Sequence, residues 1–127
     1  MATGDNAMLT RASVSFHTNG EDKDGDTQVE VTVRLIDQTV VASIADAFGP
    51  FDDNSDAGPF DLLITQAPTR GALKTGSVAV KIHPVGRDTW RFNFFLDLFF
   101  DDAAHLIAWA NGLEVSRSRP EQSFGIE

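Results

Sequence analysis

The sequence contains no cysteine, and this absence excludes disulfide bonds, zinc–thiolate sites and cysteine nucleophiles. No apolar run reaches the roughly 18 residues of a membrane-spanning helix, so no transmembrane segment is expected. The start of the chain, MATGDNAMLT, lacks the basic region and apolar centre of a signal peptide. We therefore expect a soluble protein without a secretion signal. The compartment stays open, because a cysteine-free domain is compatible with the inside and the outside of a cell.

Positive charge is also scarce. Ten Lys and Arg stand against 19 Asp and Glu, which gives a formal net charge of −9. Nucleic acid is therefore not an expected partner, because its binding depends on Lys and Arg that neutralise phosphates. Simple electrostatic adsorption to an anionic membrane is disfavoured as well, unless a bound cation reverses the local sign of the charge.

Apolar and aromatic residues, in contrast, are plentiful. The hydrophobic fraction is 42%, and ten Phe and two Trp supply large side chains for a core. A chain of 127 residues typically forms one domain. We expect residues 1–10 to form an N-terminal tail and residues 11–127 to form a single domain.

An alternation of apolar and polar residues dominates the chain and indicates half-buried β-strands. The clearest examples are 12–17, 27–35, 77–83 and 89–100. Weaker strands are expected at 39–44, 60–65, 104–109 and 113–117, and the segment 101–111 also fits a short helix. Turn residues separate these runs, and PEQSFGIE at the end fits a last short strand or a tail. The pattern predicts an all-β fold, a single antiparallel β-sandwich of eight strands.

Two acidic segments stand out between the predicted strands. In TNGEDKDGDT the aspartates follow a D-x-D-x-D spacing, and DDNSD contains a D-x-N-x-D spacing. Such spacings supply the oxygen ligands that calcium takes at about 2.3–2.6 Å. Neither segment is an EF-hand, because that loop needs Gly at its sixth position and Glu at its twelfth. Counted from Asp22 these positions hold Thr27 and Val33, and counted from Asp52 they hold Ala57 and Leu63.

Strand parity brings the two acidic segments together if the chain runs strictly up and down. The connections at 18–26, 45–59, 84–88 and 110–112 then leave the same end of the sandwich, with Asp88 and Asn111 nearby. Asp101 and Asp102 are expected at the opposite end. The prediction depends on 39–44 being a strand.

Carboxylates crowded at one end repel one another, because each disfavours the charged form of its neighbours. Lys23 is the one basic residue within the two segments, and Arg87 follows in a neighbouring connection. A calcium ion resolves the repulsion. The alternative is a pair of solvated turns whose charges are screened over about 8–10 Å. The predicted metal ligands are Asn19, Glu21, Asp22, Asp24, Asp26, Asp52, Asp53, Asn54, Asp56 and Asp88.

At this point residues 10–118 resemble the C2-like sandwiches, and among them the PLAT type most closely. The likeness rests on the strand ending SFHTNGEDKDGDT that leads into QVEVTV, on GPFDL, and on VKIHPVGRDTWRFNFFLDL. PLAT domains have a Gly-rich loop where this chain has the more acidic TNGEDKDGDT. The resemblance implies an eight-stranded sandwich, loop-bound calcium, and binding of lipid surfaces or proteins rather than chemistry.

Other residues of chemical interest have structural explanations. His17 and His83 are expected on outward strand faces, and no nucleophile elbow or zinc-spaced pair of histidines is present. Asp97 needs an outward face or a partner such as Arg91 or Lys81, because burial of an unpaired carboxylate is costly. Phe95 and Phe99 share the polar face of their strand and either cover a second layer or form an exposed patch. Trp90 and Trp109 are expected to anchor the core.

These features predict a non-catalytic, calcium-binding β-sandwich module that attaches to a lipid surface or a protein. One alternative is a calcium-dependent carbohydrate-binding module. Another is a structural domain that self-associates through its Phe-bearing strand face or a sheet edge. The oligomeric state stays open, and we do not expect an enzyme.

Overall fold

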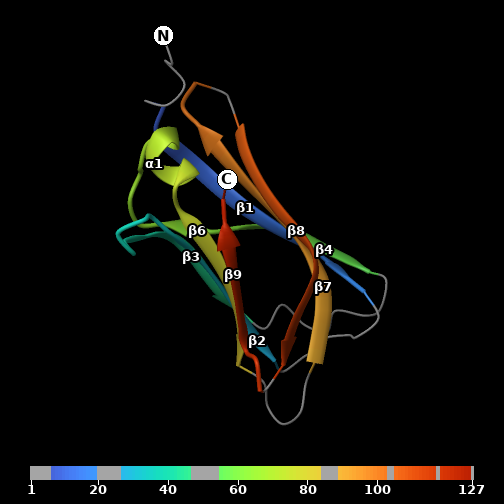
Figure 1. Cartoon of the computed structure of the whole chain (residues 1–127). Coiled ribbons are helices and arrows are strands. Elements are labelled where there is room, and N and C mark those ends of the chain that lie inside the picture. The colour runs from blue at the N-terminus through green and yellow to red at the C-terminus, as the bar shows by residue number, and fades with distance from the viewer. Residues whose placement is uncertain are drawn as a thin grey trace.

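The computed structural model describes residues 7–19, 27–46, 55–83, 89–102, 105–116 and 118–126. Within these ranges the chain is almost entirely β-structure, arranged in two layers (Figure 1). The elements are β1 (Leu9–Thr18), β2 (Gln28–Arg34), β3 (Val40–Asp46), β4 (Asp56–Asp61), β5 (Leu63–Ile64), α1 (Arg70–Lys74), β6 (Ser77–His83), β7 (Thr89–Phe100), β8 (His105–Ser116) and β9 (Glu121–Gly125).

The strands form two antiparallel sheets that pack as a sandwich. The four-stranded sheet has the order β4-β1-β7-β8, and the five-stranded sheet has the order β5-β3-β2-β6-β9. Each sheet turns its apolar face inward, as the alternation in the sequence predicts. The all-β sandwich is therefore confirmed, although the described residues form nine strands instead of eight.

One extra strand arises because the expected strand 60–65 is divided between the two sheets. β4 pairs with β1 in the four-stranded sheet, whereas β5 pairs with β3 in the other. Leu62 lies at the crossing point, where its backbone N–H donates to the Ala12 carbonyl at 2.9 Å. The side chain of Leu62 is buried. The chain thus crosses from one sheet to the other at a single buried leucine.

The expected strands 104–109 and 113–117 are instead one continuous strand, β8. We interpreted the Asn-Gly pair at 111–112 as a turn, and this prediction was wrong. Gly112 has a φ of +68°, and the pairing of β7 with β8 shifts opposite Asn93, between Phe92 and Phe94. The Gly112 N–H donates to Asn93 Oδ1 at 2.9 Å. Asn-Gly therefore forms a β-bulge that bends the strand without reversing it.

The remaining elements complete the sandwich. PEQSFGIE contributes the strand β9, which pairs with β6. The short helix α1 replaces an expected turn, and Thr69 caps it by accepting a hydrogen bond from the Ala72 N–H at 3.3 Å. Ala7 and Leu9 are already buried, so the core begins before residue 11. No helix of the described residues is long and apolar enough to cross a membrane.

An aromatic cluster centred on Phe16 fills one part of the core. Its ring lies 5.2 Å from Trp90, 6.1 Å from Phe92 and 5.7 Å from Phe94, measured between centroids. All four side chains are buried, and Trp90 Nε1 donates to Thr18 Oγ1 at 3.0 Å. Trp90 is a core anchor as predicted. The same prediction was wrong for Trp109, whose side chain is 64% exposed.

Candidate functional site

The strand ends that border the acidic segments meet at one end of the sandwich. The Thr18 N–H donates to the Ser55 carbonyl at 2.9 Å, so the end of β1 adjoins the start of β4. In the other sheet, Gln28 pairs with His83 and Val29 with Asp46. The connections after β1, β3 and β6 therefore leave from this end, which we call the acidic end. The prediction from strand parity is confirmed for these three connections.

The fourth connection at the acidic end was misplaced. Residues 110–112 lie within β8 because of the bulge, so the chain does not reverse there. β8 continues to Ser116, and the connection to β9 follows it. Asn111 thus belongs to a sheet face instead of a connecting loop.

Two of the ten predicted metal ligands fall within the described residues. Asp56 Oδ1 lies 2.7 Å from His17 Nδ1, and Asn19 Nδ2 donates to Asn93 Oδ1 at 3.0 Å. Both are thus tied to the outer face of the four-stranded sheet. Within the described ranges no group of three or more His, Asp and Glu side chains is placed to hold a metal. The other eight ligands lie outside these ranges: Glu21, Asp22, Asp24, Asp26, Asp52, Asp53, Asn54 and Asp88.

That outer face carries a groove of about 320 Å³ that the sequence did not predict. Two neighbouring rows of side chains build it. The first row is aromatic, because Phe95 of β7 pairs with Ser15 of β1 on one side and Trp109 of β8 on the other. The second row is polar and runs across all four strands through Asp56, His17, Asn93 and Asn111. The groove is therefore apolar along one side and hydrogen-bonding along the other.

Two glycines shape the walls of the groove. Gly58 has a φ of +109°, and a Cβ atom there would lie 2.7 Å from the Val14 carbonyl oxygen. Only glycine allows β4 to approach β1 this closely. On the other side, the bulge at Gly112 brings Asn111 beside Asn93. Backbone irregularities on both flanks thus set the positions of the polar row.

Pairs of charged or polar side chains and an edge-on contact between two rings lie on the part of this sheet face beyond the groove. Asp97 lies on this outer face, which is one of the two alternatives we expected, and it pairs with His105 at 2.9 Å instead of with Arg91 or Lys81. Phe99 lies between the Arg11 guanidinium, 5.3 Å from its ring, and the His105 ring at 4.4 Å. Phe95 keeps 41% of its surface exposed. Of the two alternatives for these phenylalanines, the exposed patch therefore describes Phe95, whereas side chains partly cover Phe99.

The histidines lie on outward faces, as predicted for His17 and His83. The third, His105, starts β8, and all three pair with carboxylates on neighbouring strands. The His83 contact with Glu30 is the longest, at 3.6 Å. Each histidine is thus placed beside a carboxylate of the neighbouring strand.

Sequence reasoning missed Trp109 as a surface residue. One signal was available in the sequence. Alternate residues of a strand lie on the same face, and two of the four residues on the face of Trp109 are polar: His105, Ile107, Trp109 and Asn111. The opposite parity carries Ala108 and Ala110, which face the bulky Leu96 and Phe94 across the pair of strands. The large side chains of β7 fill most of the core here, so only small residues such as alanine fit opposite them. The larger indole of Trp109 consequently lies outside.

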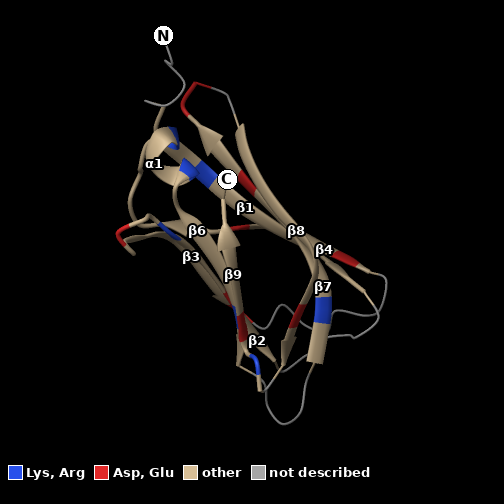
Figure 2. Cartoon of the chain, in the orientation of Figure 1, with Lys and Arg blue, Asp and Glu red and all other residues tan. Residues whose placement is uncertain are grey.

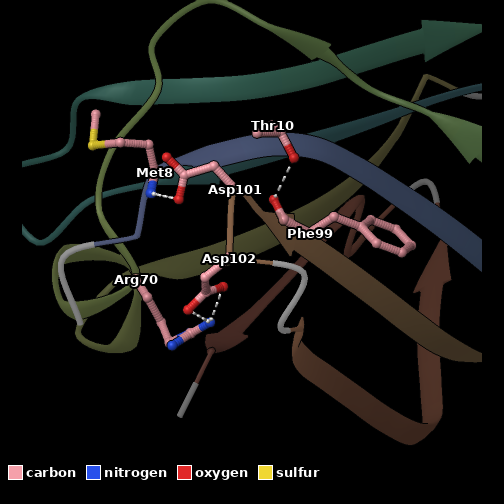
Figure 3. Close-up of polar contacts among 6 residues, drawn as sticks. All are labelled: Met8, Thr10, Arg70, Phe99, Asp101 and Asp102. Carbon is pink, nitrogen blue, oxygen red and sulfur yellow. Dashed lines mark hydrogen bonds and ion pairs between the residues drawn. The ribbon is translucent and has the colours of Figure 1, made fainter. Parts of the chain in front are cut away.

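At the opposite end of the sandwich, Asp101 and Asp102 have protein partners (Figure 3). Asp101 Oδ1 accepts a hydrogen bond from the Met8 N–H at 3.1 Å. The Arg70 guanidinium donates to both oxygens of Asp102, at 3.0 and 3.3 Å. Figure 2 shows basic residues on α1 near the acidic residues that follow β7. The placement of this aspartate pair away from the acidic end is confirmed.

Comparison with known proteins adds no assignment. No family model matches the sequence, and no curated protein gives a significant match. The likeness to C2-like and PLAT sandwiches therefore stays a prediction from sequence pattern.

Proposed function

We propose that this protein is a non-catalytic β-sandwich module that binds calcium at its acidic end and attaches there to a lipid surface or a protein. The observation that carries the proposal is the hydrogen bond between Thr18 and Ser55, two residues that border the two acidic segments. It joins the end of β1 to the start of β4, so the segments 20–26 and 47–54 have one neighbouring pair of ends. At the other pair of ends, Asp46 is paired with Val29, the residue after Gln28, in the five-stranded sheet.

Charge supports an ion at this end. The segments 20–26 and 47–54 contain the carboxylates of Glu21, Asp22, Asp24, Asp26, Asp52 and Asp53 and a single basic residue, Lys23. Carboxylates within about 4–6 Å disfavour one another's charged forms, and a divalent cation removes that penalty. Calcium takes six to eight oxygen ligands in a flexible geometry, which suits short carboxylates on loops better than magnesium's strict octahedron does.

A calcium ion also makes attachment to an anionic surface possible. The chain has a net charge of −9, so without a cation it is repelled by anionic lipids and acidic proteins. A bound divalent ion is the largest single local charge in such a site; it reduces the negative charge there and can take oxygen ligands from a lipid headgroup or an acidic protein as well as from the chain. Calcium is thus both a structural ion and a bridge in this proposal.

Thermal unfolding with calcium and with EDTA tests the calcium site. A ligand that binds only the native state stabilises it by about 2.7 kcal/mol at one hundred times its dissociation constant. We expect a higher unfolding midpoint in calcium, and a reduced shift in Asp24→Asn and Asp52→Asn. Asp61→Asn is the matched control, because Asp61 is an exposed aspartate of β4 that pairs with Arg11 away from the acidic end. Equal midpoints in calcium and EDTA would contradict the proposal.

Co-sedimentation with vesicles tests the attachment. We expect binding to phosphatidylserine vesicles in calcium, none in EDTA, and none with Asp24→Asn and Asp52→Asn combined. If the calcium shift is present but no vesicle binds, the partner is a protein. A stable oligomer whose association ignores calcium would instead favour the self-associating alternative.

A further inference from the structure

The groove on the four-stranded sheet is not used by the calcium proposal, and its chemistry differs from that of the acidic end. We propose that this groove binds one sugar ring of a neutral saccharide, with Trp109 as the stacking surface and the polar row from Asp56 to Asn111 as the hydroxyl-binding side. The proposal goes beyond calcium binding and does not depend on it.

Trp109 and Phe95 form a platform that the fold itself does not require. They are directly paired on neighbouring strands, and they keep 64% and 41% of their surfaces exposed. Trp90 of β7, by comparison, is fully buried and bonded to Thr18. Two adjacent exposed aromatic rings on an ordered sheet are typical of a binding surface, because each offers a large rigid apolar area. The C–H groups on one face of a sugar ring match such a surface.

The polar row is fixed in position and keeps hydrogen-bonding capacity for a ligand. Asn93 Oδ1 accepts from both Asn19 and Gly112, which fixes the orientation of the amide and leaves its Nδ2 group as a donor. His17 Nδ1 lies 2.7 Å from Asp56 Oδ1, so the carboxylate occupies that ring nitrogen and Nε2 is left for a ligand hydroxyl. Within the described part of the chain, Nδ2 of Asn93 and the Asn111 side chain make no hydrogen bond.

This pattern of donors and acceptors matches adjacent hydroxyl groups, since each hydroxyl both donates and accepts. A sugar ring has hydroxyls along its edge and apolar patches on its faces. An edge-on position against the polar row places one face over the aromatic row. The two rows are neighbours on the same sheet, so a single ring spans both of them.

Charge and size select this occupant over others. The described residues that line the groove include one carboxylate and one histidine but no Lys or Arg, so among them phosphate, sulfate and carboxylate ligands find no counter-charge. A volume of about 320 Å³ is at the small end of ligand sites and fits one ring, with the rest of a chain in solvent. Acyl chains are not favoured, because five of the eleven described lining residues have polar side chains to which an acyl chain offers no hydrogen bond.

Tryptophan fluorescence tests the proposal directly. The chain has two tryptophans, and Trp90 is buried, so quenching by acrylamide reports on Trp109. The probes are methyl glucoside, methyl galactoside and methyl N-acetylglucosaminide, and hexasaccharides of glucose, xylose, mannose and N-acetylglucosamine. All are used in calcium buffer at up to about 10 mM, which detects millimolar affinity. We expect at least one hexasaccharide to protect Trp109 saturably from quenching.

Variants assign the binding to the groove, with calorimetry as the readout. We expect Trp109→Ala to weaken the saccharide at least tenfold and Asn111→Ala to weaken it severalfold, each without a change in the unfolding midpoint. Ile107→Ala is the matched control, because Ile107 is exposed on the same strand and does not line the groove. It should bind like the unmodified protein.

Three results would overturn the proposal. They are the absence of protection by every saccharide, unchanged affinity in Trp109→Ala, and protection by phosphatidylcholine vesicles in place of saccharides. Calcium is present at one concentration throughout, and the saccharide titration and the calcium-dependent shift in unfolding midpoint are separate measurements. A protein without a calcium shift can still pass this test, and one with a calcium shift can still fail it.

Discussion

The two ends of the sandwich hold aspartates in different ways. At the end where β7 meets β8, the protein supplies the partners: a backbone N–H for Asp101 and a guanidinium for Asp102. At the acidic end, the segments 20–26 and 47–54 contain six carboxylates and one lysine. This difference in charge balance between the two ends is the reason we propose that the second end binds an external cation.

Arg70→Met removes the side chain that pairs with Asp102. Among the variants that compare the two ends, it should cause the largest loss of stability. The Arg70 side chain is only 12% exposed, it bonds Asp102, and its guanidinium lies 4.7 Å from the Phe100 ring. We expect a loss of about 2 kcal/mol in the free energy of unfolding, measured by urea denaturation. The calcium response should be unchanged, because the two ends are separate.

Arg11→Met is the matched control for Arg70→Met. Arg11 also pairs with an aspartate and lies near a phenylalanine ring, but both members of its ion pair are more than half exposed. We expect this substitution to cost less than about 1 kcal/mol, since exposed ion pairs contribute little. Equal losses for the two arginines would show that burial does not distinguish them.

The dependence of stability on salt concentration tests the acidic end, and its expected effect is intermediate in size. In EDTA, raising sodium chloride from about 10 mM to about 1 M shortens the Debye length from about 30 Å to about 3 Å. We expect this screening to stabilise the protein by about 1 kcal/mol, because it weakens carboxylate repulsion. The gain should shrink in the combined variant Asp24→Asn and Asp52→Asn. An equal gain in that variant would place the repulsion elsewhere in the chain.

Asp101→Ala has the smallest expected effect. It removes one exposed hydrogen bond from the Met8 N–H, whereas the backbone bond from the Asp101 N–H to the Met8 carbonyl at 3.0 Å remains. We expect a loss of about 0.5–1 kcal/mol by urea denaturation. A gain in stability would mean that Asp101 is under the same repulsion as the acidic end, and the contrast between the two ends would fail.

The sequence predicted the architecture well because one physical pattern controls it. Alternation of apolar and polar residues located β1, β2, β6 and β7 and assigned their inward faces correctly. It failed where one residue changes the path of the chain. Leu62 moves the chain between sheets, and Gly112 turns an expected loop into a bulge. Alternation does not detect such changes, because they are set by the partner strand.

The groove was hidden for a related reason. In HLIAWAN both faces of the strand contain apolar residues, so the pattern alone does not tell which face is inside. The large residues of β7 decide the matter, since Phe94 and Leu96 leave room only for alanines opposite. The ligands of the acidic end, in contrast, are proposed from residue type and spacing. Calcium titration of the aspartate variants is the experiment that tests them.

Calorimetric titration of calcium into protein freed of metal by EDTA and then dialysed is the most direct test of the central claim. The account predicts saturable calcium binding that is weakened by Asp24→Asn and by Asp52→Asn and is unaffected by Asp61→Asn. It also predicts weaker binding of magnesium, which demands a stricter geometry. No saturable heat with calcium, or equal binding by all three variants, would contradict it.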